Sequence, residues 1–140
     1  MNRNIIEQTL SIIKPDAVER NLEEKIKFFF EKRNLKVFKS KKIKITKNEA
    51  AEFYKEHQTK PFYENLCNYL SSGPIIVMIL EGDDAIIKNR EIMGATDPLK
   101  ANEGTLRKMY GISIDKNSVH GSDSLKNAKA EIEFFFNKES

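Results

Sequence analysis

The chain has 140 residues, which suits one compact domain over residues 1–140 with its own hydrophobic core. Its 24 basic and 21 acidic residues nearly balance, so the net charge of +3 is weak support for a polyanionic partner. The single cysteine, Cys67, excludes an internal disulfide, and no apolar run is long enough to span a membrane. Because the first residues also lack a secretory signal, we expect a cytoplasmic protein.

The first elements of the chain alternate between strand and helix. Residues 9–13 are a short β-rich run that Pro15 stops. Lys14, just past this strand, could face a ligand at the sheet edge or could be a solvated charge. A helix is expected over residues 16–30, and residues 35–45 then alternate apolar side chains with lysines. This second strand would have one wet face, although its lysines could also form a nucleic-acid patch.

A hairpin of two helices is expected next. Thr46 and Glu49 have the spacing of a capping box and begin a helix over residues 50–57. A second helix follows, with Pro61 in its first turn. The tight connection places the tip of the hairpin near Phe62, where it could form one wall of a cleft.

The middle of the chain contains the candidate for a central strand. Residues 75–80 are a nearly continuous apolar run, as in strands that are buried on both faces. Asp83 is expected to cap a helix over residues 85–93. Residues 94–104 show no periodicity, and an irregular segment of this length in a small domain suggests a functional loop. Residues 105–110 could make one helical turn.

The most informative stretch surrounds His120, just before the last helical pattern. His120 lies where a strand ends, and Gly121 would let the backbone turn before Ser122 or Asp123 caps the helix. Glu131 falls on or beside the apolar stripe of that helix, where a carboxylate needs a partner. If it accepts a hydrogen bond from one ring nitrogen of His120, the other nitrogen is left as a nucleophile. The alternative is a structural histidine among turn and cap residues, and local reasoning leaves both open.

The predicted elements run strand, helix, strand, two helices, strand, helix, loop, strand, helix. Four strands with helices between them predict an α/β sandwich in which helices pack on a sheet. Neither glycine-rich phosphate-binding motif occurs in the sequence, so a glycine cradle for phosphates is excluded. A cysteine-rich zinc pattern does not occur either.

The stretch around His120 resembles the active-site signature of nucleoside diphosphate kinases, Asn117-Ser118-Val119-His120-Gly121-Ser122-Asp123-Ser124. Other family motifs are matched in the same order along the chain: Ile13-Lys14-Pro15-Asp16, Lys60-Pro61-Phe62-Tyr63, Ser72-Gly73-Pro74, Arg90, Met93-Gly94, Thr96-Asp97-Pro98 and Gly104-Thr105-Leu106-Arg107. The resemblance covers residues 9–136, which is nearly the whole chain.

This resemblance implies a ferredoxin-like α/β (α+β) sandwich with a four-stranded antiparallel sheet. It also implies a ping-pong exchange, in which a nucleoside triphosphate, typically ATP, phosphorylates Nδ1 of a histidine and a nucleoside diphosphate then collects the phosphate. His120 would be that nucleophile. Glu131 would bond the opposite ring nitrogen, and Ser122 would assist the carboxylate.

Further family positions imply contacts with the nucleotide. They are Lys14, Tyr54, Phe62, Leu66, Arg90, Thr96, Arg107, Ile114, Asn117 and Gly121. Phe62 matches the aromatic residue on which the base stacks, which predicts little discrimination among bases. The implied cofactor is Mg²⁺, held mainly by the nucleotide phosphates and not by a metal site of protein side chains. Since family members are hexamers or tetramers, a homo-oligomer is expected, and neither a membrane nor a nucleic acid is a required partner.

Two features do not follow simply from the resemblance. A regular strand would place Asn117 and His120 on opposite faces, so one shared site requires an irregular strand end, which Gly121 makes possible. The chain also departs from the usual family residues, and these departures concern packing, loops and assembly: Asn21, Glu24, Lys60 and Asp97.

Two other classes of function compete with the phosphotransferase. A nucleotide- or nucleic-acid-binding regulator without chemistry would be expected to lack His120 or Glu131, and both are present. A metal-dependent hydrolase using His120 and Asp123 would release free phosphate without an acceptor. Two ligands far from any third make a poor metal site, however.

Overall fold

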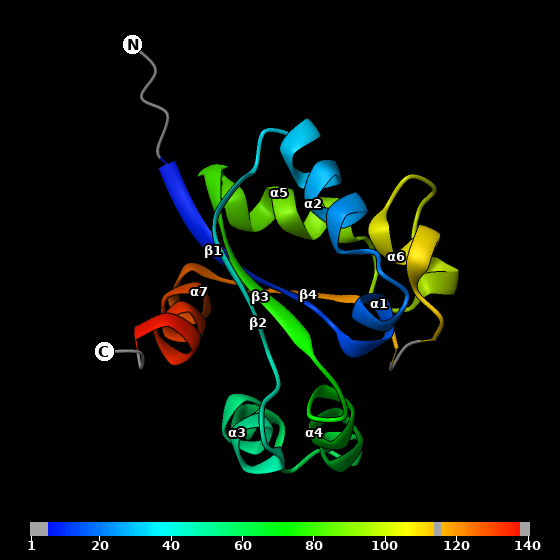
Figure 1. The fold of residues 1–140 in the computed structure, drawn as a ribbon, viewed down its shortest axis with the longest axis vertical. Coiled ribbons are helices and arrows are strands. Elements are labelled where there is room, and N and C mark those ends of the chain that lie inside the picture. The colour runs from blue at the N-terminus through cyan, green and yellow to red at the C-terminus, as the bar shows by residue number, and fades with distance from the viewer. Residues whose placement is uncertain (1–5, 114–115, 138–140) are drawn as a thin grey trace.

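The computed structural model describes residues 6–113 and 116–137, and these build one sheet covered by helices (Figure 1). The strands are β1 (Ile6–Ile13), β2 (Lys36–Ile43), β3 (Ile75–Asp83) and β4 (Val119–Gly121). They lie in the order β2-β3-β1-β4, and each neighbouring pair is antiparallel. The sheet order and the helices between the strands give the predicted ferredoxin-like α/β sandwich, which is confirmed.

Helices fill every connection between the strands. They are α1 (Pro15–Glu19), α2 (Glu23–Lys32), α3 (Lys47–Phe53), α4 (Tyr63–Leu70), α5 (Ala85–Met93), α6 (Leu106–Tyr110) and α7 (Leu125–Ile132). Short 3-10 turns lie at Lys55–His57 and Pro98–Lys100, and a π-helical turn at Glu133–Asn137 extends α7. No helix among the described residues is both long and apolar enough to cross a membrane.

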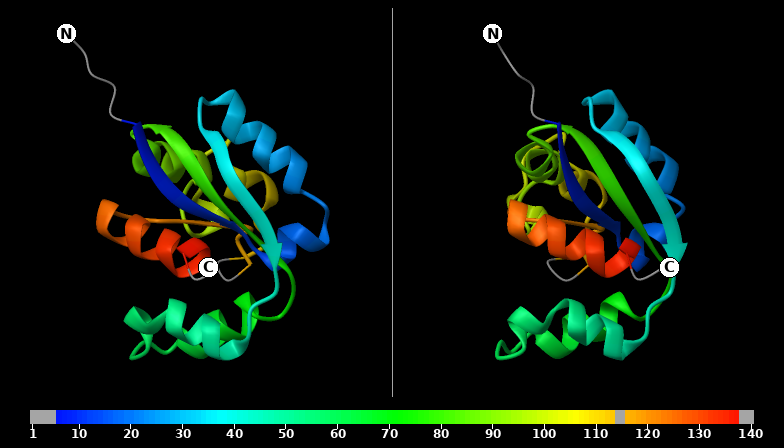
Figure 2. Two further views of the ribbon diagram at one scale, coloured as in Figure 1. Left: turned by 60° about the vertical axis from the view of Figure 1, so that its left-hand side comes forward. Right: turned by 90° about the vertical axis from the view of Figure 1, so that its left-hand side faces the viewer.

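Helices lie on both sides of the sheet and bury both faces of its central strands, whereas the edge strand β2 has no buried residue (Figure 2). Alternate residues of β3 enter two separate clusters, since successive strand residues point to opposite faces. Met78 belongs to a cluster with Phe30 of α2 and Ile92 of α5. Val77 belongs to the other, with Leu70 of α4. The continuous apolar run of residues 75–80 is therefore a strand buried on both faces, as predicted.

Two boundaries in the first half of the chain differ from the predicted ones. The helix expected over residues 16–30 is two helices, because the chain turns at Asn21 with φ 59°. Asparagine tolerates this left-handed conformation better than most residues. Pro61 lies before α4 instead of in its first turn, since Phe62 is the N-cap of that helix.

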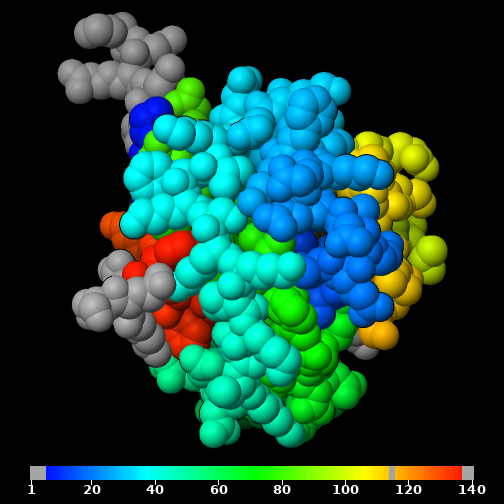
Figure 3. Space-filling model, viewed as in Figure 1, coloured from blue at the N-terminus to red at the C-terminus, as the bar shows by residue number. Residues whose placement is uncertain are grey.

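Two predicted helix caps were also wrong. Strand β3 continues through Asp83, so the N-cap of α5 is Asp84, at φ 48° and without a side-chain cap bond. The N-cap of α7 is Ser124, whose Oγ accepts the backbone N–H of Asn127 at 3.1 Å. Figure 3 shows the face of the molecule on which residues of α1, α2 and β2 form much of the surface, with part of α7 visible at its left edge.

Candidate active site

The site is built around His120, which β4 places beside α7. His120 pairs with Ile12 of β1, and Ile12 belongs to the cluster on the α7 side of the sheet. Its Nε2 lies 3.0 Å from Oε1 of Glu131, and Ser122 Oγ donates to the same oxygen at 2.8 Å. A carboxylate accepts hydrogen bonds, so Nε2 carries the proton and Nδ1 keeps its lone pair. The pairing that the apolar stripe predicted for Glu131 is present.

Glycine is required at position 121 because a side chain would not fit there, and not because the backbone turns with positive φ. A Cβ at this position would lie within contact distance of Asn89 Nδ2 and 2.7 Å from Met93 Cε. Helix α5 therefore packs directly against the backbone of β4, next to His120.

Asp123 follows at the start of α7, where its carboxylate accepts a hydrogen bond from Asn127 Nδ2 at 2.6 Å. This bond lowers the pKa of Asp123, and the charge of Arg90 lowers it further. Asp123 is therefore an anion at neutral pH, and a positive group lies near it.

Aromatic residues form one wall beside His120. The ring of Phe53 meets the imidazole edge-on, with centroids 5.3 Å apart and planes at 73°. A cavity of about 110 Å³ is lined here by Phe53, Tyr54, Glu56, His57, His120, Gly121, Asp123, Asn127 and Glu131. Burial raises the pKa of Tyr54, so its hydroxyl stays protonated. The wall thus offers a neutral phenol beside the imidazole.

The hairpin of α3 and α4 carries the candidate base-stacking residues. His57 links the tip to the cavity, because its ring centroid lies 6.2 Å from that of Tyr54 and 6.0 Å from that of Phe62. Phe62 is 42% exposed, with Lys60 Nζ 5.6 Å from its centroid. Leu66 is partly buried against the core cluster that contains Ile12, on the α7 side of the sheet. Ile114, the third predicted apolar contact, lies outside the described residues.

Basic side chains form a second part of the site, in which Arg90 lies near Asp123 and Arg107 near Tyr54. Arg107 is buried and donates to the carbonyls of Gly94 at 3.0 Å and Val119 at 2.9 Å. Burial, and then the charge of Arg90, lowers the pKa of Arg107 to about 10. A second cavity, of about 320 Å³, is lined by Arg90, Thr96 and Arg107 among others. Glu91 also lines this cavity, so the two guanidinium groups leave it with a net positive charge that favours an anion.

Lys14 and Asn117 join this basic side of the site. Lys14 is buried and is not a solvated charge. Its Nζ donates to Asn117 Oδ1 at 2.9 Å, and Asn117 Nδ2 donates to the carbonyl of Thr96 at 3.1 Å. These contacts bring together residues from the ends of β1, the loop after α5 and the approach to β4.

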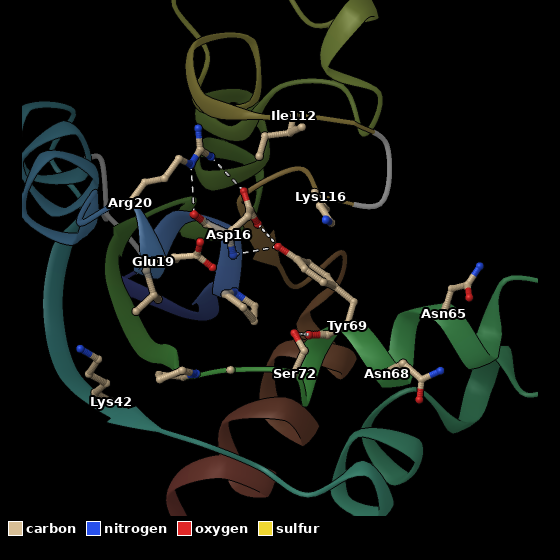
Figure 4. A pocket seen from close by; sticks show the side chains of 14 residues that line it. Asp16, Glu19, Arg20, Lys42, Asn65, Asn68, Tyr69, Ser72, Ile112 and Lys116 are labelled. Atoms are coloured by element: carbon tan, nitrogen blue, oxygen red, sulfur yellow. Dashed lines mark hydrogen bonds and ion pairs between the residues drawn. The ribbon is translucent and has the colours of Figure 1, made fainter.

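One cluster of polar residues was not predicted. It surrounds the carboxylate of Asp16, which accepts hydrogen bonds from Arg20 Nη2 at 3.0 Å and from the hydroxyl of Tyr69 (Figure 4). The same carboxylate accepts a hydrogen bond from Ser118 Oγ at 2.8 Å. Burial and the bond to Asp16 raise the pKa of Tyr69, so it remains a donor. The cluster borders a cavity of about 900 Å³. Little in the sequence indicated this cluster, because Asp16 and Tyr69 are 53 residues apart in the chain.

Comparisons with known proteins agree with this geometry. The profile of the nucleoside diphosphate kinase family matches residues 7–140. The chain is 53% identical over 133 residues to the nucleoside diphosphate kinase of Persephonella marina, covering 95% of each chain. It is 54% identical to that of Nitratiruptor sp., covering 94% of this chain and 96% of the relative. A crystal structure of the Aquifex aeolicus nucleoside diphosphate kinase superposes with a TM-score of 0.92 at 38% identity, covering 94% of this chain and 96% of the other. The chain therefore belongs to the nucleoside diphosphate kinase family.

Proposed function

We propose that the γ-phosphate of a nucleoside triphosphate passes to a nucleoside diphosphate through Nδ1 of His120. The chain is an enzyme of a family that uses nucleotides as substrates. The observation that supports His120 as the nucleophile is its contact with Glu131, which engages Nε2 and leaves the Nδ1 lone pair for attack. In the first half-reaction, Nδ1 forms a bond to the γ-phosphorus while the bond to the bridging oxygen breaks. That oxygen leaves with the electron pair on the diphosphate.

The second half-reaction reverses these bonds. A terminal oxygen of a second nucleoside diphosphate attacks the phosphorus, and the electron pair of the Nδ1–P bond returns to the ring. Throughout, the Nε2 proton stays between His120 and Glu131, where the carboxylate offsets the positive charge of the phosphorylated imidazole. Ser122 holds the same carboxylate oxygen in place.

The basic side of the site would bind the phosphates. Lys14, Arg90 and Arg107 supply positive charge, and Thr96 and Asn117 lie among them. Phosphoryl transfer spreads charge over the equatorial oxygens, so fixed cations and donors stabilise the transition state without a glycine loop. On the aromatic side, we place the base on Phe62, beside Leu66 and Ile114, with Tyr54 and the backbone of Gly121 nearer the sugar and phosphates.

The family requires a divalent cation, and we infer that it is Mg²⁺. Among the described residues, no group of three or more His, Cys, Asp or Glu side chains lies together as a metal site would require. We place the ion on the nucleotide phosphates, because proteins usually hold Mg²⁺ through the phosphates of a substrate and at most one or two carboxylates. When bound there, Mg²⁺ neutralises part of the phosphate charge.

The cellular setting is also inferred from the family. We expect one domain over residues 1–140, since the family profile spans residues 7–140. We expect a homo-oligomer, a hexamer or a tetramer, acting in the cytoplasm where nucleoside triphosphate pools are used. Light scattering coupled to size-exclusion chromatography would give the subunit number directly.

Labelling with γ-³²P-ATP tests the nucleophile. The wild-type protein should acquire acid-labile, base-stable phosphate and pass it to added nucleoside diphosphate. His120→Ala should acquire none, whereas His57→Ala, which removes the other histidine, should still be labelled. Phosphoenzyme in His120→Ala would disprove the assignment. A regulator without chemistry would show no label in any variant, and a hydrolase would release free phosphate without an acceptor.

A further inference from the structure

Ser118 adopts a backbone conformation that serine normally avoids. Its φ is 76°, and the N–H of Val119 donates to the carbonyl of Asn117 at 2.9 Å. Ser118 is therefore the central residue of a γ-turn with positive φ, the rare and strained form of this turn. The side chain is fully buried. A strained conformation of a residue other than glycine persists only when its surroundings hold it.

This turn explains how Asn117 and His120 serve one site. Strand β4 begins only at Val119, so the alternation of side chains does not extend back to Asn117. After the turn, His120 faces Glu131 at 3.0 Å. Before it, Asn117 reaches Lys14 and the carbonyl of Thr96. The irregularity that the sequence required lies at Ser118 and not at Gly121, whose φ is not positive.

Three contacts hold Ser118 in this turn. Its Oγ donates to Asp16 Oδ2 at 2.8 Å and accepts from Arg20 Nη2 at 3.2 Å. Its carbonyl accepts the backbone N–H of Lys14 at 2.8 Å. Both side-chain contacts are made with α1, because Asp16 lies in the first turn of this helix and Arg20 is its C-cap.

The carboxylate of Asp16 is itself firmly held. Its side chain is only 4% exposed, and it forms an ion pair with Arg20 at 3.0 Å. Tyr69 donates its hydroxyl to Asp16 Oδ1 and accepts the backbone N–H of Asp16 at 2.8 Å. Arg20 also donates to the carbonyl of Tyr110 at 2.6 Å. Figure 4 shows Arg20 and Tyr69 approaching Asp16 from opposite sides. The acceptor for Ser118 is thus fixed from both sides by residues of the chain itself.

We propose that Asp16 is a positioning residue for phosphoryl transfer: through the hydroxyl of Ser118 it holds the left-handed turn that aims Asn117 and His120 at the same nucleotide. The proposal rests on the function proposed above, since it requires His120 to be the nucleophile. Asp16 does not contact the reacting atoms. It acts by holding the positive-φ conformation of Ser118, which would otherwise relax to a less strained one. Relaxation would displace His120, and a small displacement of a nucleophile is enough to slow a reaction severely.

Two substitutions at Ser118 separate this role from a general structural one. Ser118→Ala and Ser118→Gly both remove the hydroxyl, but only glycine adopts positive φ without steric strain. We would measure single-turnover phosphoenzyme formation at saturating ATP, its dependence on ATP concentration, and the labelled fraction. Ser118→Ala should react about tenfold more slowly at saturation, while every chain is still labelled. Ser118→Gly should stay within about threefold of wild type. Ser72→Ala is the matched control, because Ser72 lines the same cavity without contacting Asp16.

Asp16 is tested by rescue. Asp16→Asn should also slow the saturated rate about tenfold, and Asp16→Asn/Ser118→Gly should recover most of that loss, because glycine no longer needs the acceptor. A merely structural role for Asp16 predicts a lower melting temperature in both variants and no recovery of the rate. The proposal is overturned if Ser118→Ala reacts like wild type, if Ser118→Gly is as slow as Ser118→Ala, or if the double variant shows no recovery. Absence of label in the wild-type protein would instead refute the proposed function.

Discussion

Glu131 Oε1 lies 3.0 Å from His120 Nε2, and the two residues come from different elements, α7 and β4. Both side chains are about one-fifth exposed, so the contact is partly shielded from water. A carboxylate at this distance fixes the ring orientation, holds the proton on Nε2 and stabilises the imidazole when it becomes positively charged. The contact therefore contributes more as the ring gains charge than it does in the resting enzyme.

Glu131→Gln should lower the rate of phosphoenzyme formation about tenfold. The amide can still accept a hydrogen bond from Nε2, but a neutral acceptor stabilises a charged ring less, by about 1–2 kcal/mol. Rapid-quench measurements at saturating ATP would give this rate. Glu133→Gln is the matched control, since Glu133 is an exposed carboxylate two residues further along and should react like wild type. An unchanged rate in Glu131→Gln would show that the charge of Glu131 is not used.

The pairing of Glu131 could be predicted because it follows from local pattern and a simple physical requirement. A carboxylate on an apolar stripe needs a partner, and the imidazole of His120, placed just before the same helix, was one candidate. The cap of α7 could not be predicted in the same way. The sequence suggested Ser122 or Asp123, but both side chains have other partners: Ser122 bonds Glu131 and Asp123 bonds Asn127, and Ser124 is the cap.

The turn at Ser118 shows where sequence reasoning ends. Strand alternation correctly showed that Asn117 and His120 could share a site only if the strand end were irregular. It could not show which residue breaks the alternation, because Ser118 has no intrinsic preference for positive φ. The conformation depends on Asp16, which lies 102 residues away. The break between α1 and α2 at Asn21 escaped prediction for a related reason, since the apolar periodicity continues across it.

Phe62→Ala should raise the KM for every nucleoside diphosphate by a similar factor, about tenfold. Stacking of a base on an aromatic ring contributes about 1–3 kcal/mol and depends little on which base is present. Initial rates with adenine, guanine, cytosine and uracil diphosphates would measure the effect. Phe28→Ala removes another exposed phenyl ring, 63% exposed on α2, and should leave these KM values unchanged. A loss confined to one base would mean that Phe62 reads base identity.

Tyr54 should make the protein less stable as the pH rises above about 10. Burial raises the pKa of Tyr54 in the folded chain above its ordinary value of 10.0. Above that pH, the unfolded chain loses the tyrosine proton while the folded chain keeps it. The free energy of unfolding then falls by up to about 1.4 kcal/mol per pH unit from this group. Below pH 10 the contribution is constant.

Urea unfolding at pH 8, 9 and 11 would reveal this effect by comparison with Tyr54→Phe, which has no phenol to titrate. The difference between the two proteins should be constant from pH 8 to 9 and should narrow or reverse by about 1 kcal/mol at pH 11. Arg107 acts in the opposite direction, because its folded pKa of about 10 lies below its ordinary value. It is present in both proteins and cancels only in part, because the negative charge of an ionised Tyr54 raises the pKa of Arg107. A difference independent of pH would mean that Tyr54 ionises as it does in the unfolded chain.

Gly121→Ala should destabilise the protein and slow the reaction together. The new Cβ would overlap Asn89 Nδ2 and lie 2.7 Å from Met93 Cε, so these two side chains must shift where α5 packs against β4. Overpacking of this kind lowers the free energy of unfolding by about 1–3 kcal/mol, and the shift would displace His120 from Glu131. Asn89→Ala should rescue both properties, because it vacates the space and removes a fully buried amide that has no hydrogen-bond partner among the described residues. Urea unfolding and the phosphorylation rate of Gly121→Ala, Asn89→Ala and the double variant would test this. Equal damage in the single Gly121→Ala variant and the double variant would locate the conflict at Met93, since only that contact remains in both.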